Sequence, residues 1–510
     1  MPHSEIKSTQ LRLGVRRLLD APDAAQAFAA LYADSRDAFW LDSSRPGDGA
    51  QFSFMGDASG PLAATIAYDV SEGEITIERG GEVETRNESI FDYLERELER
   101  LRPLAADLPF DFDCGFTGYL GYEMKADCGA SSGHRSQSPD AAFVFADRML
   151  AFDHEQGHVY LLCLCEPETA GSSEAWLSAT ESRLLRLAAA AALRKDTGEG
   201  SAEPPRCCSA EPSPVSFRLA RPRQRYLEDI ATCQDHLLEG ESYEICLTNS
   251  IEAEVDADPL HLYMELRRVN PAPFASYLRF GDLAVLSSSP ERFLRIDRRG
   301  GVETRPIKGT SPRGGSAAED QRLAEELRRS EKNRAENLMI VDLTRNDLGA
   351  VCAVGSVEVP VLMEVETYET VHQLVSTVRG SLRPEATAIE CVRSCFPPGS
   401  MTGAPKLRTM EILEQLEGRA RGVYSGAIGF FGLGGACDLS VTIRTIVLAG
   451  ESASIGAGGA IVLQSDAQNE LEEALLKARA PMAAIGRVAA TSRFPALEPK
   501  YSGGGLSEKP

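Results

Sequence analysis

Acidic residues at helical spacing are the first sign of chemistry in the sequence. Glu470 and Glu473 lie three residues apart in a segment with helical periodicity, so they share one face of a helix. Glu336 lies near the end of a second charged helical segment, and Glu291 follows Ser-Ser-Ser-Pro at a predicted strand end. Two or three carboxylates suit Mg²⁺, which prefers oxygen ligands and keeps some of its waters. The same spacing also fits carboxylates that are solvated at the surface.

Two basic residues stand in contexts that suit an anionic ligand. Lys308 lies at a predicted strand end and precedes Gly-Thr, whose backbone N–H groups can hold an anion. A buried lysine with a pKa lowered by desolvation can also be a nucleophile, although an ordinary surface lysine fits the same string. Arg444 lies in a stretch that we predict to be an otherwise apolar strand, where its charge needs a carboxylate or an anionic ligand.

A mixture of helices and strands must position these residues. The spacing of apolar residues distinguishes the two kinds of element. The predicted helices cover 23–34, 89–101, 173–195, 225–240, 318–340, 406–418 and 469–488. The predicted strands cover 37–44, 51–57, 141–153, 158–166, 242–255, 274–280, 282–289, 293–298, 301–309, 426–433, 438–449 and 459–466. Long antiparallel stretches, rather than regular strand–helix–strand units, indicate an α+β fold.

Length and composition are those of an ordinary globular protein with an acidic balance. The 510 residues carry 53 basic and 76 acidic side chains, and the net charge of −23 argues against binding of nucleic acid and against a polybasic membrane anchor. No run of about 18 apolar residues occurs, so we expect no membrane span. The twelve cysteines follow no disulfide framework, and the N-terminal sequence lacks an apolar signal core, so we expect a cytoplasmic location.

A proline-rich stretch divides the sequence. Residues 196–214 contain four prolines and almost nothing to bury, which is typical of a linker. We therefore predict an N-terminal α/β region over 1–195, a linker over 196–214, a second domain over 215–490 and a flexible tail over 491–510.

Several strings in the second domain resemble one enzyme family. In order, they are SSSPERF, RPIKGT, ENLMIVDLTRNDLG, CFPPGSMTGAPKLRTMEILEQLE, VYSGAIGF, TIRT, GAGGAIV and NELEEALLKA. Together they resemble the chorismate-utilising enzymes, a family that includes the first components of anthranilate and aminodeoxychorismate synthases, isochorismate synthases and salicylate synthases. The first half is similar to the N-terminal part of the two members that add ammonia. The resemblance implies a chorismate-binding catalytic domain over 215–490 and large, mostly antiparallel sheets packed as a sandwich, with helices on the outside.

Two positions bear on the reaction that the resemblance implies. Anthranilate synthases usually carry PIAGT where this sequence has PIKGT, as aminodeoxychorismate synthases do, so Lys308 favours the second group. Water-adding members use a lysine at the position of Glu244, which disfavours them, and many aminodeoxychorismate synthases have Gln there. The resemblance thus implies conversion of chorismate and ammonia to 4-amino-4-deoxychorismate, toward 4-aminobenzoate and folate. Anthranilate synthesis is the alternative.

The resemblance also implies roles in catalysis and metal binding. Lys308 would attack C2 of the ring as a neutral amine, helped by a pKa lowered by desolvation, and Glu291 would protonate the departing 4-hydroxyl as general acid. Mg²⁺ would be bound by Glu336 and Glu473, with Glu470 close by. Asn333 stands where some family members have a further acidic residue.

Further residues are implied in binding the substrate. Gly309 and Thr310 would hold the ring carboxylate, and Arg444 would grip the enolpyruvyl carboxylate. The complete implied set is Gly309, Thr310, His372, Thr402, Gly403, Tyr424, Arg444, Ala457, Gly458, Lys477 and Glu244.

The resemblance finally implies a partner and a second binding site. We find no GxCxG nucleophile elbow with a downstream His-x-Glu, so ammonia is expected from a separate glutamine amidotransferase subunit. The segment Leu41-Asp42-Ser43 is similar to a region where family members bind tryptophan, which makes Ser43 a candidate tryptophan site.

Overall fold

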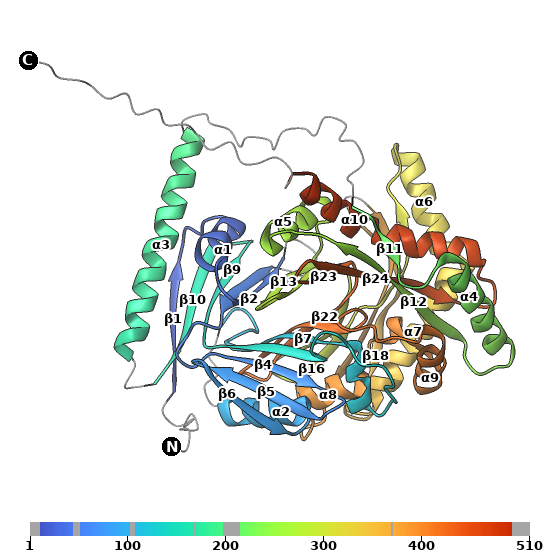
Figure 1. The fold of residues 1–510 in the computed structure, drawn as a ribbon, viewed down its shortest axis with the longest axis horizontal. Coiled ribbons are helices and arrows are strands. Elements are labelled where there is room, and N and C mark those ends of the chain that lie inside the picture. Colours follow the sequence, from blue (N-terminus) through green and yellow to red (C-terminus); the bar gives the residue numbers. More distant parts are fainter. Residues whose placement is uncertain are drawn as a thin grey trace, which may run out of the picture.

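Two large antiparallel sheets form the framework of the protein (Figure 1). The computed structural model describes residues 11–43, 51–102, 108–166, 170–196, 215–368 and 371–491. Across the first sheet the order is β1 (Arg12–Leu18), β10 (His158–Cys165), β9 (Arg148–Asp153), β3 (Phe52–Asp57), β2 (Asp37–Asp42), β13 (Phe274–Phe280), β14 (Leu283–Ser289), β23 (Thr445–Ala449), β24 (Ser452–Ile461), β12 (Glu244–Glu254) and β11 (Arg218–Leu219), and β20 (Gly403–Ala404) pairs with β12.

The second sheet packs face to face with the first. Across it the order is β17 (Ile307–Pro312), β19 (Val371–Ser381), β16 (Gly301–Thr304), β15 (Arg292–Ile296), β22 (Cys437–Val441), β21 (Ala427–Gly432), β7 (Gly115–Leu120), β8 (Ala141–Ala146), β4 (Ala64–Asp69), β5 (Glu74–Arg79) and β6 (Glu82–Asn87), and β18 (Glu358–Thr367) pairs with β19. Aromatic rings fill the space between the sheets, where Phe54 of β3 meets Phe430 of β21 edge to face and Phe112 stacks on Phe430 with ring centroids 4.5 Å apart.

Helices cover the outside of this sandwich (Figure 1). Those on the side of the first sheet are α1 (Ala24–Tyr32), α3 (Ala170–Asp196), α4 (Arg223–Leu238), α5 (Pro259–Val269), α9 (Lys406–Glu417) and α10 (Ala467–Thr491). Those on the side of the second are α2 (Ile90–Leu101), α6 (Ala317–Arg329), α7 (Glu331–Gly349) and α8 (Ala388–Cys395), with short 3₁₀ helices η3 (Tyr122–Cys128) and η5 (Gly399–Met401). The predicted α+β sandwich is confirmed. None of the helices in the described ranges has the length and apolar run needed to cross a bilayer.

The chain crosses from one sheet to the other inside two segments that we predicted to be single strands. The predicted strand 141–153 breaks at the buried Asp147, between β8 of the second sheet and β9 of the first. The predicted strand 438–449 breaks at 442–444, between β22 and β23. Both predictions of one continuous strand were wrong because the strands on both sides of each crossing are largely buried, so the apolar residues do not mark where the chain changes sheets.

The charged helix predicted over 318–340 is two helices. Ser330 ends α6 and caps α7, since its hydroxyl accepts a hydrogen bond from the N–H of Asn333. The second helix, which carries Glu336, continues to Gly349.

The predicted domains follow one another along the sequence, on either side of the predicted linker 196–214. Residues 197–214 of the predicted linker and 492–510 of the predicted tail lie outside the described residues. In space, both sheets contain strands from both sides of 196–214, so the two halves share one framework.

Candidate active site

Glu291 and Arg444 lie at neighbouring crossings between the sheets. The chain crosses between β14 and β15 at Glu291, and between β22 and β23 at Arg444. Backbone hydrogen bonds join the two crossings, from Val441 N to Glu291 O (3.0 Å) and from Ser288 N to Arg444 O (3.3 Å). Arg444 has a positive φ of 54°, so it lies at a bend rather than inside the predicted strand.

The charge of Arg444 is not paired with a carboxylate. Its Nη1 donates to the backbone oxygen of Lys477 (3.1 Å), and no carboxylate of the described residues lies within 4.0 Å of its guanidinium nitrogens. Burial lowers the pKa of Arg444. A buried guanidinium without a counter-ion can bind a carboxylate of a ligand with two hydrogen bonds.

Lys308 and Glu244 form a buried ion pair between the sheets. Lys308 is on β17 of the second sheet, Glu244 begins β12 of the first, and the Nζ–Oε1 distance is 3.0 Å. The side chains are 11% and 0% exposed. The Oε2 atom of Glu244 is buried and has no hydrogen-bond partner.

The expected lowering of the Lys308 pKa was wrong. Burial does disfavour the ammonium, but the nearby charges of Glu244 and Glu336 favour it more strongly, so the pKa of Lys308 is raised. These surroundings therefore favour the ammonium form of Lys308, which must lose a proton before the lysine can act as a nucleophile.

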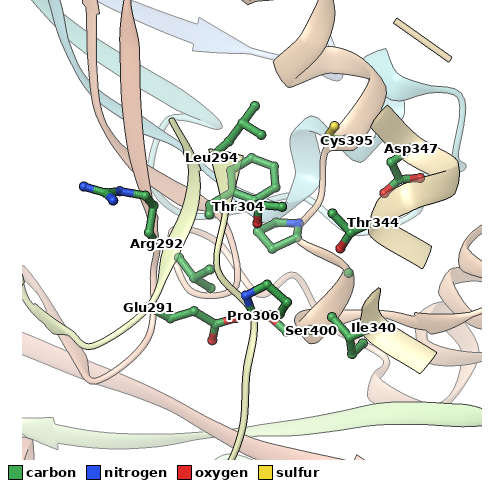
Figure 2. A pocket seen from close by; sticks show the side chains of 14 residues that line it. Glu291, Arg292, Leu294, Thr304, Pro306, Ile340, Thr344, Asp347, Cys395 and Ser400 are labelled. Carbon is green, nitrogen blue, oxygen red and sulfur yellow. The ribbon is translucent and has the colours of Figure 1, made fainter. Parts of the chain in front are cut away.

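Glu291 is suited to hold a proton at neutral pH. Burial raises its pKa to about 7, while Lys308 and a hydrogen bond with Ser400 act in the opposite direction. Figure 2 shows its carboxyl group facing Pro306 and Ser400, while the Arg292 guanidinium points the other way. These residues line a narrow cavity of about 30 Å³.

The three predicted metal ligands come from two helices. Glu336 lies on α7, while Glu470 and Glu473 lie on α10. The Lys332 amine is 2.9 Å from Glu470 and 3.8 Å from Glu336, and Lys477 is 2.9 Å from Glu473. A cationic group thus lies between two of the three acids.

These acids fit Mg²⁺ in their chemistry. The Oε1 atom of Glu336 is buried without a hydrogen-bond partner, and a hard cation would satisfy it. Glu473 is half exposed, so its carboxylate is accessible. The carboxylates of Glu336, Glu470 and Glu473 do not bring three ligand atoms within 4.8 Å of one another. Among the described residues, the only group of three His, Cys, Asp or Glu side chains that does so is His236, Glu239 and Glu241 at the surface.

Tyr424 and the glycines of β24 shape one wall. The Tyr424 ring lies directly on Gly456, where a Cβ atom would be 2.0 Å from the ring. Lys477 Nζ donates to the oxygen of Gly458 (2.9 Å), and Ala457 lies between these glycines in the same strand. Only a residue without a side chain permits this contact at 456.

The predicted residues near Lys308 have different surroundings. Gly309 has a φ of 91°, and a Cβ there would lie 2.8 Å from the side chain of Asn333. Thr310 is exposed. His372 is buried, and both ring nitrogens are engaged, Nδ1 with Thr367 (2.9 Å) and Nε2 with Asp320 (3.0 Å). His372 therefore fixes α6 against β19, and its contact with a substrate stays a prediction.

The Thr402–Gly403 segment packs against the strand that carries Glu244. The oxygen of Thr402 accepts from Cys246 N (2.9 Å), and a Cβ at Gly403 would lie 2.0 Å from the oxygen of Glu244. This close approach holds the start of β12 in place.

Ser43 lines a separate and larger cavity of about 280 Å³. Five phenylalanines contribute to its walls, together with Arg292 and Arg295, whose guanidinium groups pair with Asp438 and Asp111. The Ser43 hydroxyl donates to Phe52 O (2.7 Å). Arg292 lines this cavity as well as the one beside Glu291.

Sequence reasoning missed two residues of the site. Lys332 lies four residues before Glu336 on the same helix, and this spacing could have revealed the pair. Ser400 lies in the predicted motif CFPPGSMTGAPK, but no pattern in the sequence indicates that it meets Glu291.

Comparison with known proteins places the chain in one family. The profile of the chorismate binding enzyme family matches residues 39–483, so the chain belongs to this family. A protein of Streptomyces pristinaespiralis named aminodeoxychorismate synthase is 49% identical over 93% of this chain, and this chain spans 65% of that relative's length. Anthranilate synthase component 1 of Streptomyces coelicolor is 35% identical over 93% of this chain and 88% of its own.

A solved structure has the same architecture. Anthranilate synthase component I from Streptococcus pneumoniae superposes with a TM-score of 0.67 at 30% identity, covering 86% of this chain and 93% of its own. The likeness accounts for the sandwich of two sheets.

Proposed function

We propose that the chain converts chorismate and ammonia to 4-amino-4-deoxychorismate. The observation that carries the proposal is a lysine, Lys308, held between the sheets against Glu244 and close enough to Glu291 for its charge to affect the pKa of that acid. The 49% identity to a protein named aminodeoxychorismate synthase supports the same reaction.

Lys308 and Glu291 would share the chemistry. The neutral Lys308 amine attacks C2, the two conjugated double bonds of the ring shift from C1=C2 and C5=C6 to C1=C6 and C4=C5, and the 4-hydroxyl leaves as water with the proton of Glu291. Ammonia then attacks C4, both double bonds return, and the lysine leaves C2. The new ammonium group gives a proton to the Glu291 carboxylate, which restores the acid. One difficult displacement is thus divided into two easier steps.

Binding residues would hold the two carboxylates of chorismate. The unpaired guanidinium of Arg444 suits the enolpyruvyl carboxylate, with Tyr424 and the backbone of 457–458 beside it. Gly309 and Thr310 would approach the ring carboxylate. Glu336 and Glu473 would hold Mg²⁺, with Glu470 next to them, and the bound ion would stabilise negative charge on the ring carboxylate.

The proposal extends to a partner and a location. A separate glutamine amidotransferase subunit would supply ammonia, the product would lead to 4-aminobenzoate and folate, and the protein would act in the cytoplasm. We also propose that the cavity at Ser43 binds tryptophan, because the five phenylalanines that line part of it can pack against an indole ring. Titration calorimetry with tryptophan tests this site, and Ser43→Trp should abolish the heat of binding.

One incubation tests the main proposal. Purified chain is mixed with chorismate, Mg²⁺ and ammonium, and a lyase that releases 4-aminobenzoate is added. Formation of 4-aminobenzoate is expected, whereas formation of fluorescent anthranilate would favour the alternative suggested by the 35% identity to anthranilate synthases. Glutamine in place of ammonium is the control, and it should not support turnover by the chain alone.

A further inference from the structure

A carboxylate beside Lys308 can accept the proton that the lysine must lose before it attacks. Among the described residues, Glu244 is the only hydrogen-bond or ion-pair partner of the Lys308 amine. The Glu244 side chain is fully buried, so solvent does not reach the pair from that side. The Lys308 Nζ and Glu244 Oε1 atoms are 3.0 Å apart, within the range in which a proton can pass directly along the hydrogen bond.

The fold holds Glu244 firmly in this position. Ile245 pairs with both β20 and β24, and Glu244 itself pairs with Ala404. The backbones at Gly403 and Glu244 approach so closely that a Cβ at 403 would lie 2.0 Å from the Glu244 oxygen. Because Oε2 of Glu244 has no partner, the carboxylate has no competing donor that would keep it from taking a proton.

We infer that Glu244 accepts the proton from Lys308 before attack and returns it after the lysine leaves the ring. This inference rests on the proposed function. The N–H bond of the ammonium breaks as the O–H bond of Glu244 forms, and the freed lone pair attacks C2. When the C2–N bond breaks at the end, the neutral amine takes the same proton back, so the pair is restored without exchange with solvent.

Other charged groups surround the pair without bonding to it. Those that interact electrostatically with Lys308 are Glu336 from α7, Glu291 from the crossing after β14, Glu473 from α10 and Cys246 from β12. Glu336 and Cys246 also face Glu244. No hydrogen bond or ion pair joins these groups to either member. Among the residues that the structure describes, Glu244 alone is placed to take the proton directly.

The pH dependence of Glu244→Gln tests the inference. In the native enzyme the proton moves within the pair, whereas in the variant Lys308 must release it to solvent. The ratio of variant to wild-type turnover is therefore expected to rise with pH, by up to about tenfold per unit below the pKa of the unpaired lysine. Taking the ratio cancels the titration of Glu291, which both proteins share.

Two further variants make the test specific. Glu244→Asp keeps a carboxylate and should give a ratio that does not change with pH. Glu241→Gln removes a partly buried acid three residues away, paired with Arg408 and His236, and should also give a constant ratio. A constant ratio for Glu244→Gln would overturn the inference.

A second readout does not depend on turnover. The ¹³Cε signal of Lys308, assigned by its loss in Lys308→Arg, should remain that of an ammonium from pH 6 to 10 in the wild type and should titrate within this range in Glu244→Gln. The same titration in both proteins would also overturn the inference. If the wild type forms no aminodeoxychorismate, the proposed function fails, whereas the lysine signal still reports whether Glu244 controls the proton.

Discussion

The hydrogen bond between Ser400 and Glu291 gives a quantitative prediction for the pH profile of turnover. Glu291 must be protonated to release water, and its pKa is about 7 against an ordinary value of 4.5. Turnover should therefore be high at low pH and fall as pH rises through about 7, with about a tenth of the acid form left at pH 8. Since the Ser400 hydroxyl stabilises the carboxylate, Ser400→Ala should raise the pKa further.

The size of this shift follows from the energy of one hydrogen bond. A hydrogen bond to a charged group contributes about 1.5 kcal/mol, and one pKa unit corresponds to about 1.4 kcal/mol. The pKa of Glu291 in the variant is then about 8, and the variant should keep about half of its acid form at pH 8, roughly fivefold more than the wild type.

Steady-state turnover at saturating chorismate and ammonium, measured from pH 6 to 9, checks this prediction. The matched control is Ser394→Ala, because this hydroxyl donates to the oxygen of Asp347. The control should keep the wild-type profile. A Ser400→Ala profile that stays in place, or moves to lower pH, would refute the assignment of Glu291 as the acid.

Three further substitutions test the nucleophile, the metal and the substrate anion. Lys308→Arg keeps the charge but cannot attack C2, so turnover should fall by about 10³ or more, whereas a pairing role alone predicts a loss of roughly fivefold. Glu473→Gln should weaken Mg²⁺ binding by at least about tenfold in calorimetry, while the control Glu472→Gln should not. Equal Mg²⁺ affinities of Glu473→Gln and the wild type would show that Glu473 is not a ligand. Arg444→Gln should raise the KM for chorismate by about tenfold or more with a smaller effect on kcat, and an unchanged KM would exclude it as the anion site.

Local sequence patterns identified most elements that surround the site but not where the chain changes sheets. The strand prediction for 438–449 treated Arg444 as a charge inside a strand, whereas it lies at a bend with a φ of 54°. Apolar residues report burial, and the strands are largely buried on both sides of each crossing. Arg444 lies beside Glu291 because hydrogen bonds join residues about 150 positions apart, such as Val441 N to Glu291 O. No local sequence pattern predicts a pairing over that separation.

The direction of the Lys308 pKa shift could not be predicted from the sequence either. Family resemblance identified Lys308 and Glu244 as important positions, but it did not show that they meet at 3.0 Å. Burial alone would lower the pKa of the lysine, and the buried carboxylate reverses that direction. The sign of such a shift depends on distances between residues from opposite sheets.

The most direct test of the central claim is the mass of the peptide that contains Lys308 after incubation with chorismate and Mg²⁺ in the absence of ammonia. The account predicts an adduct of chorismate less one water on Lys308, which disappears when ammonium is added and 4-amino-4-deoxychorismate forms. Formation of that product at a normal rate by Lys308→Arg, with no adduct on the wild-type peptide, would contradict it.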